Sequence, residues 1–542
     1  MSDKSGQQAL RRGASSMVSA VFISRLLGIL LIVPMQNIIG EYALGLYGLA
    51  YPLYTIMLTV ATAGFPIALS KSISQLTARR HYKEANQTYF IIGRSLFLFG
   101  ILAFLVMWFG GPYYLSLSTP SPTIVHDAIP AIHALAPALL ILPLMSAQRG
   151  FLQGNLRMEP SALSQVIEQI IRVATVLVGL FIGLSLHLSP SMMAAIATFG
   201  ATTGAIGGFL LLLYSVKKLR KELQLKGRLE RTPHLRSSHV LRKLGIYSLP
   251  IVLGTLVLPL SQSIDVFTIP RELIAGGMSN HMATAQFGRY TQEALRLIQL
   301  PLSFATAIGS AVMPSITSAL SQGQFLDAKR RQHQSLKMTA FIMLPTAVTF
   351  GFLASPIDIM LFKSASGSTL ILLAAIMSLF SGLELVTTFI LQGRDHFYRP
   401  VYHMVIGMIL KLIGNIVLIP LLGINGAAIA GIIGYAVSSW LNMGTIRQVS
   451  DDAVSVPKLT WRTVTACIPL ALWLYLLNHL VFTYALTLSP FANRWVALLA
   501  VIIGIGIGAP IYLIAAIWIK AIQPSELSSL PLIGRRIARF LQ

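Results

Sequence analysis

The tripeptide Leu152-Gln153-Gly154, followed by Pro160, recurs about 240 residues later as Leu391-Gln392-Gly393, followed by Pro400. In both places the tripeptide ends one long apolar stretch, and the proline begins the next. A second match aligns residues 66–75 with residues 314–322 at an offset of about 248 residues. Two matches at nearly the same offset predict an internal repeat, and this repeat decides how the chain is arranged.

The composition identifies the solvent in which the repeat folds. The chain has 542 residues, of which 55% are hydrophobic and only 11% are charged. An ordinary soluble domain is about 25% charged, so the composition excludes a soluble globule. A membrane-spanning helix needs roughly 20 mostly apolar residues. Fourteen such stretches lie between residues 14 and 517, and they predict an all-α polytopic membrane protein with 14 transmembrane helices.

The repeat divides these helices into two sets of six. Because six is an even number, both halves start on the same side of the membrane and form parallel six-helix bundles, with two C-terminal helices left over. Two bundles around a central cavity are typical of alternating-access transporters. The predicted domains are an N-terminal bundle (1–216), a basic cytoplasmic linker (217–243), a C-terminal bundle (244–450), and helices 13 and 14 with a basic tail (451–542).

The chain is strongly basic, with 41 Lys and Arg residues against 18 Asp and Glu residues and a net charge of +23. In a soluble protein such an excess indicates a nucleic-acid partner, whereas in a polytopic membrane protein it gathers on cytoplasmic loops. A cytoplasmic N-terminus places all the long basic runs on one side: 79–83, 217–221, 329–331 and 535–536. We therefore expect both termini in the cytoplasm, the lipid bilayer as partner, and no nucleic acid.

Charges within the predicted spans are candidates for function, because an ionisable side chain is costly at bilayer depth. Arg25 and Arg296 have no obvious local partner, and we expect them to bind substrate. Guanidinium groups offer forked donors that suit phosphate or pyrophosphate oxygens. The other candidates, for ion coupling or for structural pairing, are Glu168, Arg172, Glu293, Glu384 and Lys411.

Two of these pairings follow from spacing. Glu168 and Arg172 stand four residues apart on one predicted helix, so their side chains can pair on one face. Glu384 and Lys411 lie on adjacent predicted spans and form a second candidate pair. Each pair has a structural and a functional interpretation, and the sequence leaves both open.

The chain lacks the patterns that mark enzymes and metal sites. It has no phosphate-binding loop with the GxxxxGK[ST] spacing and no HExxH sequence, and its one cysteine, Cys467, permits no cysteine-based metal cluster. We therefore expect no enzyme, no cofactor and no metal.

Four segments resemble a known family. Residues 22–28, which read Phe-Ile-Ser-Arg-Leu-Leu-Gly, resemble the Ser-Arg-x-x-Gly signature in the first helix of MurJ-type lipid II flippases. Residues 45–54 and 64–71 are similar to the stage V sporulation protein B and YtgP-like branch of that group. Further similarity lies in the predicted eighth helix, at Tyr290, Arg296, Pro301, Gly309, Pro314 and Ser315.

This resemblance implies the MATE-like fold of the multidrug/oligosaccharidyl-lipid/polysaccharide exporter superfamily, in a bacterial cell membrane. The implied substrate is an undecaprenyl-pyrophosphate-linked sugar, foremost lipid II for peptidoglycan, with wall-synthesis proteins as partners. Arg25 and Arg296 match cavity arginines of the family, whereas Leu31 stands where other members carry a further arginine. Three alternatives stay open: a flippase for another polyprenyl-linked polysaccharide, a cation-coupled multidrug exporter, and a membrane scaffold without transport.

Overall fold

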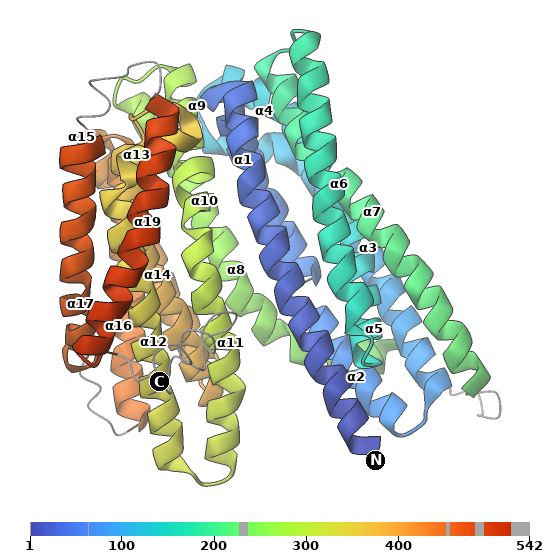
Figure 1. Cartoon of the computed structure of the whole chain (residues 1–542). Helices are drawn as coiled ribbons and strands as arrows, with labels where there is room; N and C mark the ends of the chain where they lie inside the picture. Colours follow the sequence, from blue (N-terminus) through green and yellow to red (C-terminus); the bar gives the residue numbers. More distant parts are fainter. Residues whose placement is uncertain (1, 63, 227–236, 451–455, 483–492, 522–542) are drawn as a thin grey trace. The chain divides into compact units, whose positions relative to one another are not determined.

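A computed structural model describes residues 2–62, 64–226, 237–450, 456–482 and 493–521 (Figure 1). The described residues form helices joined by short turns, and none of them lies in a β-strand, which confirms the all-α class. Lipid offers no partners for backbone N–H and C=O groups, so a chain of this composition satisfies them within helices. Residues 227–236 of the predicted linker and 522–542 of the predicted tail lie outside the described residues.

The helices group into two compact units, Met1–Gln292 and Glu293–Gln542. The first unit contains α1 (Ser2–Thr62), α2 (Phe65–Ala78), α3 (Tyr82–Ser118), α4 (Pro122–Leu135), α5 (Ala138–Gly154), α6 (Met158–Ser185), α7 (Pro190–Lys226), α8 (Ser237–Ala275) and α9 (Asn280–Gly288). The domain boundaries given above remain a prediction.

A π-helix, η1 (Arg289–Ala294), contains the boundary between the units. The second unit continues with α10 (Leu295–Leu297), α11 (Gln299–Ser321), α12 (Phe325–Phe352), α13 (Ala354–Phe362), α14 (Ser368–Gly393), α15 (Tyr398–Leu422), α16 (Ile424–Ser450), α17 (Val456–Leu476), η2 (Leu477–Phe482) and α19 (Asn493–Trp518).

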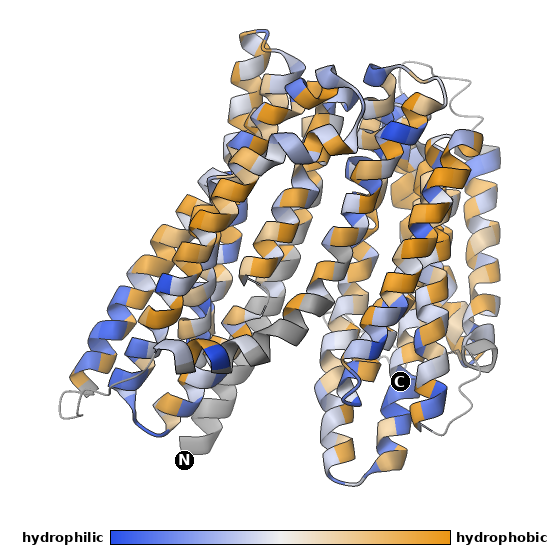
Figure 2. Ribbon diagram, turned by 180° about the vertical axis from the view of Figure 1, so that it is seen from behind, coloured by the Kyte–Doolittle hydropathy of each residue, from blue (hydrophilic) through white to orange (hydrophobic). Residues whose placement is uncertain are grey.

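Twelve helical runs among the described residues are long and apolar enough to cross a membrane, and hydrophobic residues follow these helices over much of their length (Figure 2). The predicted count of fourteen is not confirmed. The run Leu26–Ala78 holds two predicted spans, because Gly40 breaks α1 with φ 74° and ψ 175°, a conformation that glycine tolerates. The span predicted at 244–264 lies on α8, and several side chains there are outside the described part of the chain.

The predicted repeat is confirmed at two turns. After α5, the N–H groups of Asn155 and Arg157 both donate to the carbonyl of Leu152, at 3.1 and 2.9 Å. After α14, the N–H groups of Arg394 and His396 donate in the same way to Leu391, also at 3.1 and 2.9 Å. Each turn also places one residue at positive φ, Leu156 or Asp395. The repeated Leu-Gln-Gly tripeptide therefore ends the helix by the same hydrogen-bonded turn in both units.

The second match is not confirmed at its own offset, because residues 66–75 begin α2 whereas residues 314–322 end α11. The turns that end these two helices are nevertheless alike, at an offset of 243 residues. At the end of α2 the N–H of His81 donates to Leu76 (2.9 Å), and at the end of α11 the N–H of Gln324 donates to Ala319 (2.9 Å). Side chains then join these helices to the turns of the first match. Thr77 donates to the side-chain oxygen of Asn155 (3.2 Å), and Thr317 donates to the carbonyl of Gly393 (3.0 Å). Each unit thus contains the same pair of helices fastened at the same end.

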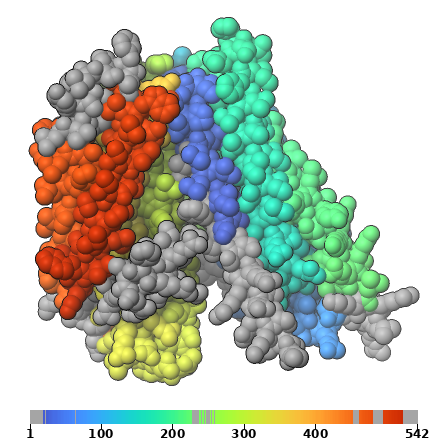
Figure 3. Space-filling view, in the orientation of Figure 1, coloured from blue at the N-terminus to red at the C-terminus, as the bar shows by residue number. Residues whose placement is uncertain are grey.

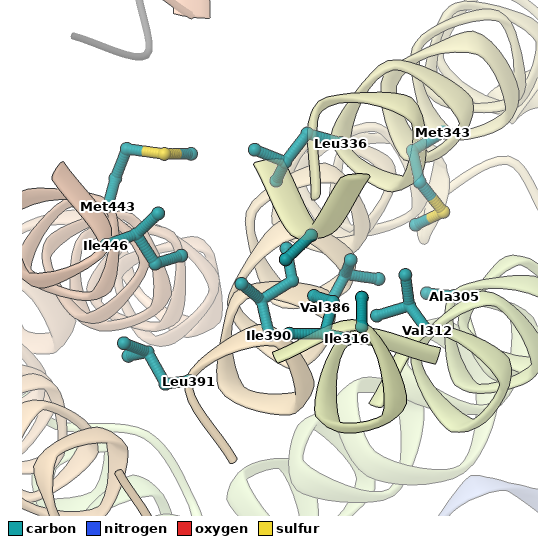
Figure 4. Packing of buried hydrophobic residues seen from close by; sticks show 12 residues of the cluster. Ala305, Val312, Ile316, Leu336, Met343, Val386, Ile390, Leu391, Met443 and Ile446 are labelled. Atoms are coloured by element: carbon teal, nitrogen blue, oxygen red, sulfur yellow. The ribbon is translucent and has the colours of Figure 1, made fainter. Parts of the chain in front are cut away.

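Each unit has its own apolar core. In the first unit, α1, α6 and α7 meet around a cluster that includes Leu31, Leu44, Val176 and Leu180. In the second unit, α11, α12, α14 and α16 meet around Val312, Ile316, Leu336, Val386, Ile390 and Ile446 (Figure 4). Burial of these side chains fixes the helices that carry the polar residues described below.

The last two long helices, α17 and α19, pack against α12 within the second unit. The hydroxyl of Tyr512 on α19 donates to the carbonyl of Phe341 on α12 (2.8 Å), and a Cβ at Gly508 would lie 2.8 Å from Leu470 on α17. The small residues Gly504 and Gly508 thus allow close helix packing. Other side chains of the two helices remain open, including Ile468 and Ile514, at 61% and 67% exposed. The two helices form the orange and red surface in Figure 3.

Candidate substrate-binding site

Arg25 lies on α1, where this helix crosses α6. Its side chain is outside the described residues, but its neighbours fix the helix. The hydroxyl of Ser24 donates to the carbonyl of Gln165 (3.3 Å), and a Cβ at Gly28 would lie 3.3 Å from the side-chain nitrogen of Gln169. The backbone of Arg25 is therefore held against residues 165–169 of α6, the stretch that contains Glu168.

Glu168 accepts a charged hydrogen bond, but not from the residue that the spacing predicted. Nη2 of Arg149, on α5, lies 2.8 Å from Oε2 of Glu168, and Nε of Arg149 donates to the hydroxyl of Ser164 (3.2 Å). The predicted pairing of Glu168 with Arg172 is wrong. A pair on one helix gains only a few tenths of a kilocalorie, whereas Arg149 reaches the carboxylate from a neighbouring helix and is anchored by a second bond.

Arg172 points instead to the tyrosines of α1. Its Nη2 atom donates to the hydroxyls of Tyr47 (3.0 Å) and Tyr51 (3.3 Å), and its guanidinium lies 5.8 Å from the centre of the Tyr51 ring. The rings of Tyr47 and Tyr51 stack with centres 5.3 Å apart, and the ring of Tyr54 follows at 5.6 Å. These hydroxyls are neutral, so this arrangement orients the guanidinium while leaving its positive charge in place.

Glycines on α7 allow this helix to pack closely against the backbone of α6. A Cβ at Gly204 would lie 2.5 Å from the carbonyl oxygen of Glu168, and one at Gly200 would lie 3.1 Å from that of Arg172. Such approaches exclude any larger residue without movement of a helix. These glycines thus serve helix packing, and they also set the positions of the two charged residues.

In the second unit, Arg296 lies on the three-residue α10, between the π-helix η1 and α11. It is half-buried, and Glu293, within η1, is 3% exposed. π-Helical turns inside longer helices are frequent at functional sites because they shift side chains out of the regular register. The predicted site residue therefore occupies the one irregular stretch of this helix among its described residues.

Glu384 is bound within a network of neutral groups. Its Oε1 accepts from the hydroxyl of Thr388 (3.0 Å), which also lies 3.2 Å from the side-chain nitrogen of Asn442 on α16. The oxygen of Asn442 in turn lies 2.8 Å from Nδ1 of His403 on α15. The expected pairing of Glu384 with Lys411 is thus not formed. Lys411 is 5% exposed and lies on α15 where this helix comes close to α16. A Cβ added at Gly434, on α16, would lie 3.3 Å from the Cβ of Lys411.

The sequence from residue 10 to residue 320 matches the family model for polysaccharide biosynthesis proteins. The chain belongs to this family. Among its relatives, "Lipid II flippase MurJ" of Bacillus subtilis (strain 168) is 29% identical over 548 residues, which cover 98% of each chain. "Stage V sporulation protein B" of the same organism is 24% identical over 542 residues, covering 98% of this chain and all of that protein. The resemblance seen in the sequence is confirmed.

Solved structures of the same fold support the assignment. A lipid II flippase MurJ in an inward closed conformation matches with a TM-score of 0.63 and 16% identity, over 92% of this chain and 98% of that one. An inward-facing multidrug resistance MATE family transporter matches with a TM-score of 0.62 and 16% identity, over 81% of this chain and 100% of the other. The predicted MATE-like fold of this family member is therefore confirmed.

The sequence missed two parts of the cationic cluster, which we define as Arg149, Arg172 and their partners Glu168, Tyr47 and Tyr51. Arg149 directly follows an apolar stretch at residues 128–148, so its place in the sequence indicates a loop rather than a membrane span. The tyrosines lie more than 120 residues from Arg172 in the chain, and no local pattern connects them. The one available signal was the spacing of Tyr47 and Tyr51, four residues apart on a helix.

The cationic cluster has the chemistry of an anion site, with two guanidinium groups against one carboxylate. Among the described residues, no group of three or more His, Cys, Asp or Glu side chains could hold a metal ion. Arg25 and Arg296 belong to different units, so their meeting in one site remains a prediction.

Proposed function

We propose that this membrane protein is a flippase that moves an undecaprenyl-pyrophosphate-linked sugar precursor, foremost lipid II, from the inner to the outer leaflet by alternating access. Full-length similarity to a protein named as a lipid II flippase supports this substrate class. The second relative is matched over its whole length, but its name gives no substrate, so transport of another polyprenyl-linked polysaccharide stays the alternative.

The observation that carries the proposal is the position of Arg172. Nη2 of this guanidinium is held by two neutral hydroxyls at 3.0 and 3.3 Å, so its charge is retained within a membrane-spanning helix. Arg25 stands on the helix that packs against the same stretch of α6. In a low-dielectric surrounding such charges attract a pyrophosphate far more strongly than they would in water. We assign headgroup binding to Arg25 and Arg296, with the cationic cluster supporting the site.

The polyprenyl tail needs an apolar surface throughout the reaction. Transfer of its roughly 55 carbons into water would cost tens of kcal/mol at about 0.8 kcal/mol per methylene. The open faces of α17 and α19 offer such a surface at Ile468, Leu472 and Ile514. In this proposal the tail stays in lipid beside these helices while the headgroup passes through the protein.

The proposal includes a location and a topology. The protein would lie in a bacterial cell membrane with both termini in the cytoplasm, where the basic runs 79–83 and 329–331 would meet anionic headgroups. Wall-synthesis proteins would act as partners on the outer side. A transporter of this kind performs no covalent chemistry, so we assign no catalytic residues.

A cation-coupled multidrug exporter is the second candidate, because the fold matches a multidrug transporter and Glu384 is a buried carboxylate. Glu384 and Glu168 would then carry the coupling ion. In that case Glu384→Gln would abolish drug resistance, whereas headgroup binding by Arg25 and Arg296 would be irrelevant. The two candidates therefore differ in which charges are essential.

The test is complementation of a bacterial strain depleted of its lipid II flippases. We expect the wild-type chain to restore lipid II at the outer leaflet, measured by cleavage with an enzyme supplied outside the cell. Arg25→Ala and Arg296→Ala should lose this activity while reaching the membrane at wild-type levels. Arg94→Ala, which removes an exposed cation on α3, is the matched control and should retain it.

Two outcomes would count against the proposal. No outer-leaflet lipid II with the wild-type chain would remove lipid II as substrate. Full activity of both arginine variants would leave transport intact but remove the site assignment.

A further inference from the structure

The second unit contains a cavity of about 840 Å³ between α14, α15 and α16 that the proposed transport does not use. Its wall is mainly apolar, with Phe380 and Leu383 contributed by α14 and Trp440 by α16. Trp440 is 71% exposed, so the cavity opens at the surface of the unit.

The cavity runs along the part of α16 that is turned away from the core of the unit. Its lining contains every residue from Ala436 to Gln448 except Ser438, Asn442 and Ile446, which recur every four residues and are fully buried. The lining extends from Ala436 to Gln448, about 18 Å along the helix at 1.5 Å per residue. One leaflet of a bilayer has a hydrocarbon depth of about 15 Å. The cavity is therefore about as long as the hydrocarbon region of one leaflet is deep, and it does not cross the membrane.

The two ends of the cavity differ in polarity. Arg447 and Gln448 lie at the end near the C-terminus of α16, whereas Ala436 and Val437 lie at the other. Arg447 is exposed and carries the positive charge of the lining. In the topology proposed above, this end faces the cytoplasm, where anionic lipid headgroups are abundant.

A histidine completes the polar end. His403 of α15 lines the cavity, and its Nδ1 lies 2.8 Å from the side-chain oxygen of Asn442, which is fully buried. This bond orients the ring and leaves Nε2 near the hydroxyl of Thr445 (3.5 Å), another lining residue. The hydrogen-bonding groups of the lining are thus positioned by the core of the unit.

We propose that this cavity binds an anionic phospholipid of the cytoplasmic leaflet, with one acyl chain along α16 and the phosphate at Arg447. Three features of the cavity match this ligand. Its length is close to the depth of one leaflet, its wall is mainly apolar, and its one cation, Arg447, lies at the membrane surface. A transported polyprenyl lipid would need a path through both leaflets. The site shares no residue with the cationic cluster and does not include Arg296. A lipid bound there would anchor the second unit in the surrounding bilayer.

The experiment measures lipid retention by the full-length protein in detergent, using native mass spectrometry with phosphatidylglycerol or phosphatidylcholine added. Wild-type protein should retain phosphatidylglycerol preferentially. Arg447→Gln should lower its occupancy about fivefold, the effect of one basic residue near an anionic headgroup. Arg271→Gln removes an exposed cation on α8 that belongs to none of the basic cytoplasmic runs, and it should change nothing.

Gly444 offers a second, independent variant. A Cβ at this position would meet no atom within 4 Å, so Gly444→Phe can fill the cavity without displacing a helix. This variant should reduce phosphatidylglycerol retention to the phosphatidylcholine level, whereas Gly444→Ala should bind as wild type. Unchanged retention in both Gly444→Phe and Arg447→Gln would overturn the site. Displacement of phosphatidylglycerol by undecaprenyl phosphate, lost in the same variants, would overturn the ligand in favour of the transported lipid.

Discussion

Arg172 on α6 donates from Nη2 to the hydroxyl of Tyr47 on α1 at 3.0 Å, and these residues are separated by 125 positions in the chain. The bond joins the two helices that carry Arg25 and Glu168. Because Tyr51 accepts from the same nitrogen at 3.3 Å, the guanidinium is held at a defined place inside the first unit.

Replacing Tyr47 and Tyr51 with phenylalanine should therefore destabilise the first unit. Each hydroxyl lost should lower the free energy of unfolding by about 0.6 to 2 kcal/mol, the range for hydrogen bonds within membranes. The measurement is the midpoint of thermal unfolding of the purified protein in detergent. Tyr113→Phe, on a tyrosine that is 68% exposed, is the control and should leave the midpoint unchanged. An equal effect of Tyr113→Phe would show that the tyrosine bonds to Arg172 contribute nothing specific.

The partner of Glu168 can be established with double-mutant cycles. Removing either Arg149 or Glu168 leaves the other half-buried charge without its partner. Arg149→Gln and Glu168→Gln should therefore each lower the free energy of unfolding of the protein. The double variant should lose less than the sum, with a coupling energy on the order of 1 kcal/mol. A parallel cycle of Glu168→Gln with Arg172→Gln should give a coupling near zero. If Glu168 coupled more strongly with Arg172 than with Arg149, the pair predicted from helical spacing would be the one that forms.

The contact of α6 with α7 gives a third prediction. In Gly204→Ala the added Cβ would lie 2.5 Å from the carbonyl of Glu168, and backbone cannot yield as a flexible side chain does. We expect a loss of about 1–3 kcal/mol in the free energy of unfolding, as for other overpacked sites. Gly93→Ala, on α3, introduces a Cβ that meets nothing within 4 Å and should be neutral or slightly stabilising. Because the shift would also move Glu168, Gly204→Ala should reduce the Arg149 coupling measured above.

The fold was largely predictable because it depends on local patterns. Apolar run lengths predicted the long helices, and the repeated tripeptides at Leu152 and Leu391 marked turns with the same hydrogen bonds. Such turns are specified by a few neighbouring residues, so a match in sequence is a match in structure. The break at Gly40 falls between two predicted spans, which end at residue 37 and begin again at residue 44.

The site was less predictable because its contacts join distant parts of the chain. Spacing along one helix suggested Arg172 as the partner of Glu168, but Arg149 on α5 forms the ion pair with this carboxylate instead. Likewise, no sequence pattern marked the π-helix beside Arg296. The sequence could show which charges lie within the membrane, while their partners depended on the tertiary structure.

The break in α1 gives the last prediction. Gly40 has φ 74° and ψ 175°, a region of backbone conformation that is almost closed to residues with a Cβ. A Cβ at Gly40 would meet no atom within 4 Å, so any effect of Gly40→Ala must come from backbone strain and not from a clash. We expect Gly40→Ala to cost about 1–3 kcal/mol in thermal unfolding. The helical Gly93→Ala is again the matched control, since its added methyl group is equally unobstructed. If both variants unfolded at the same temperature as wild type, α1 would continue through residue 40 without the break described above.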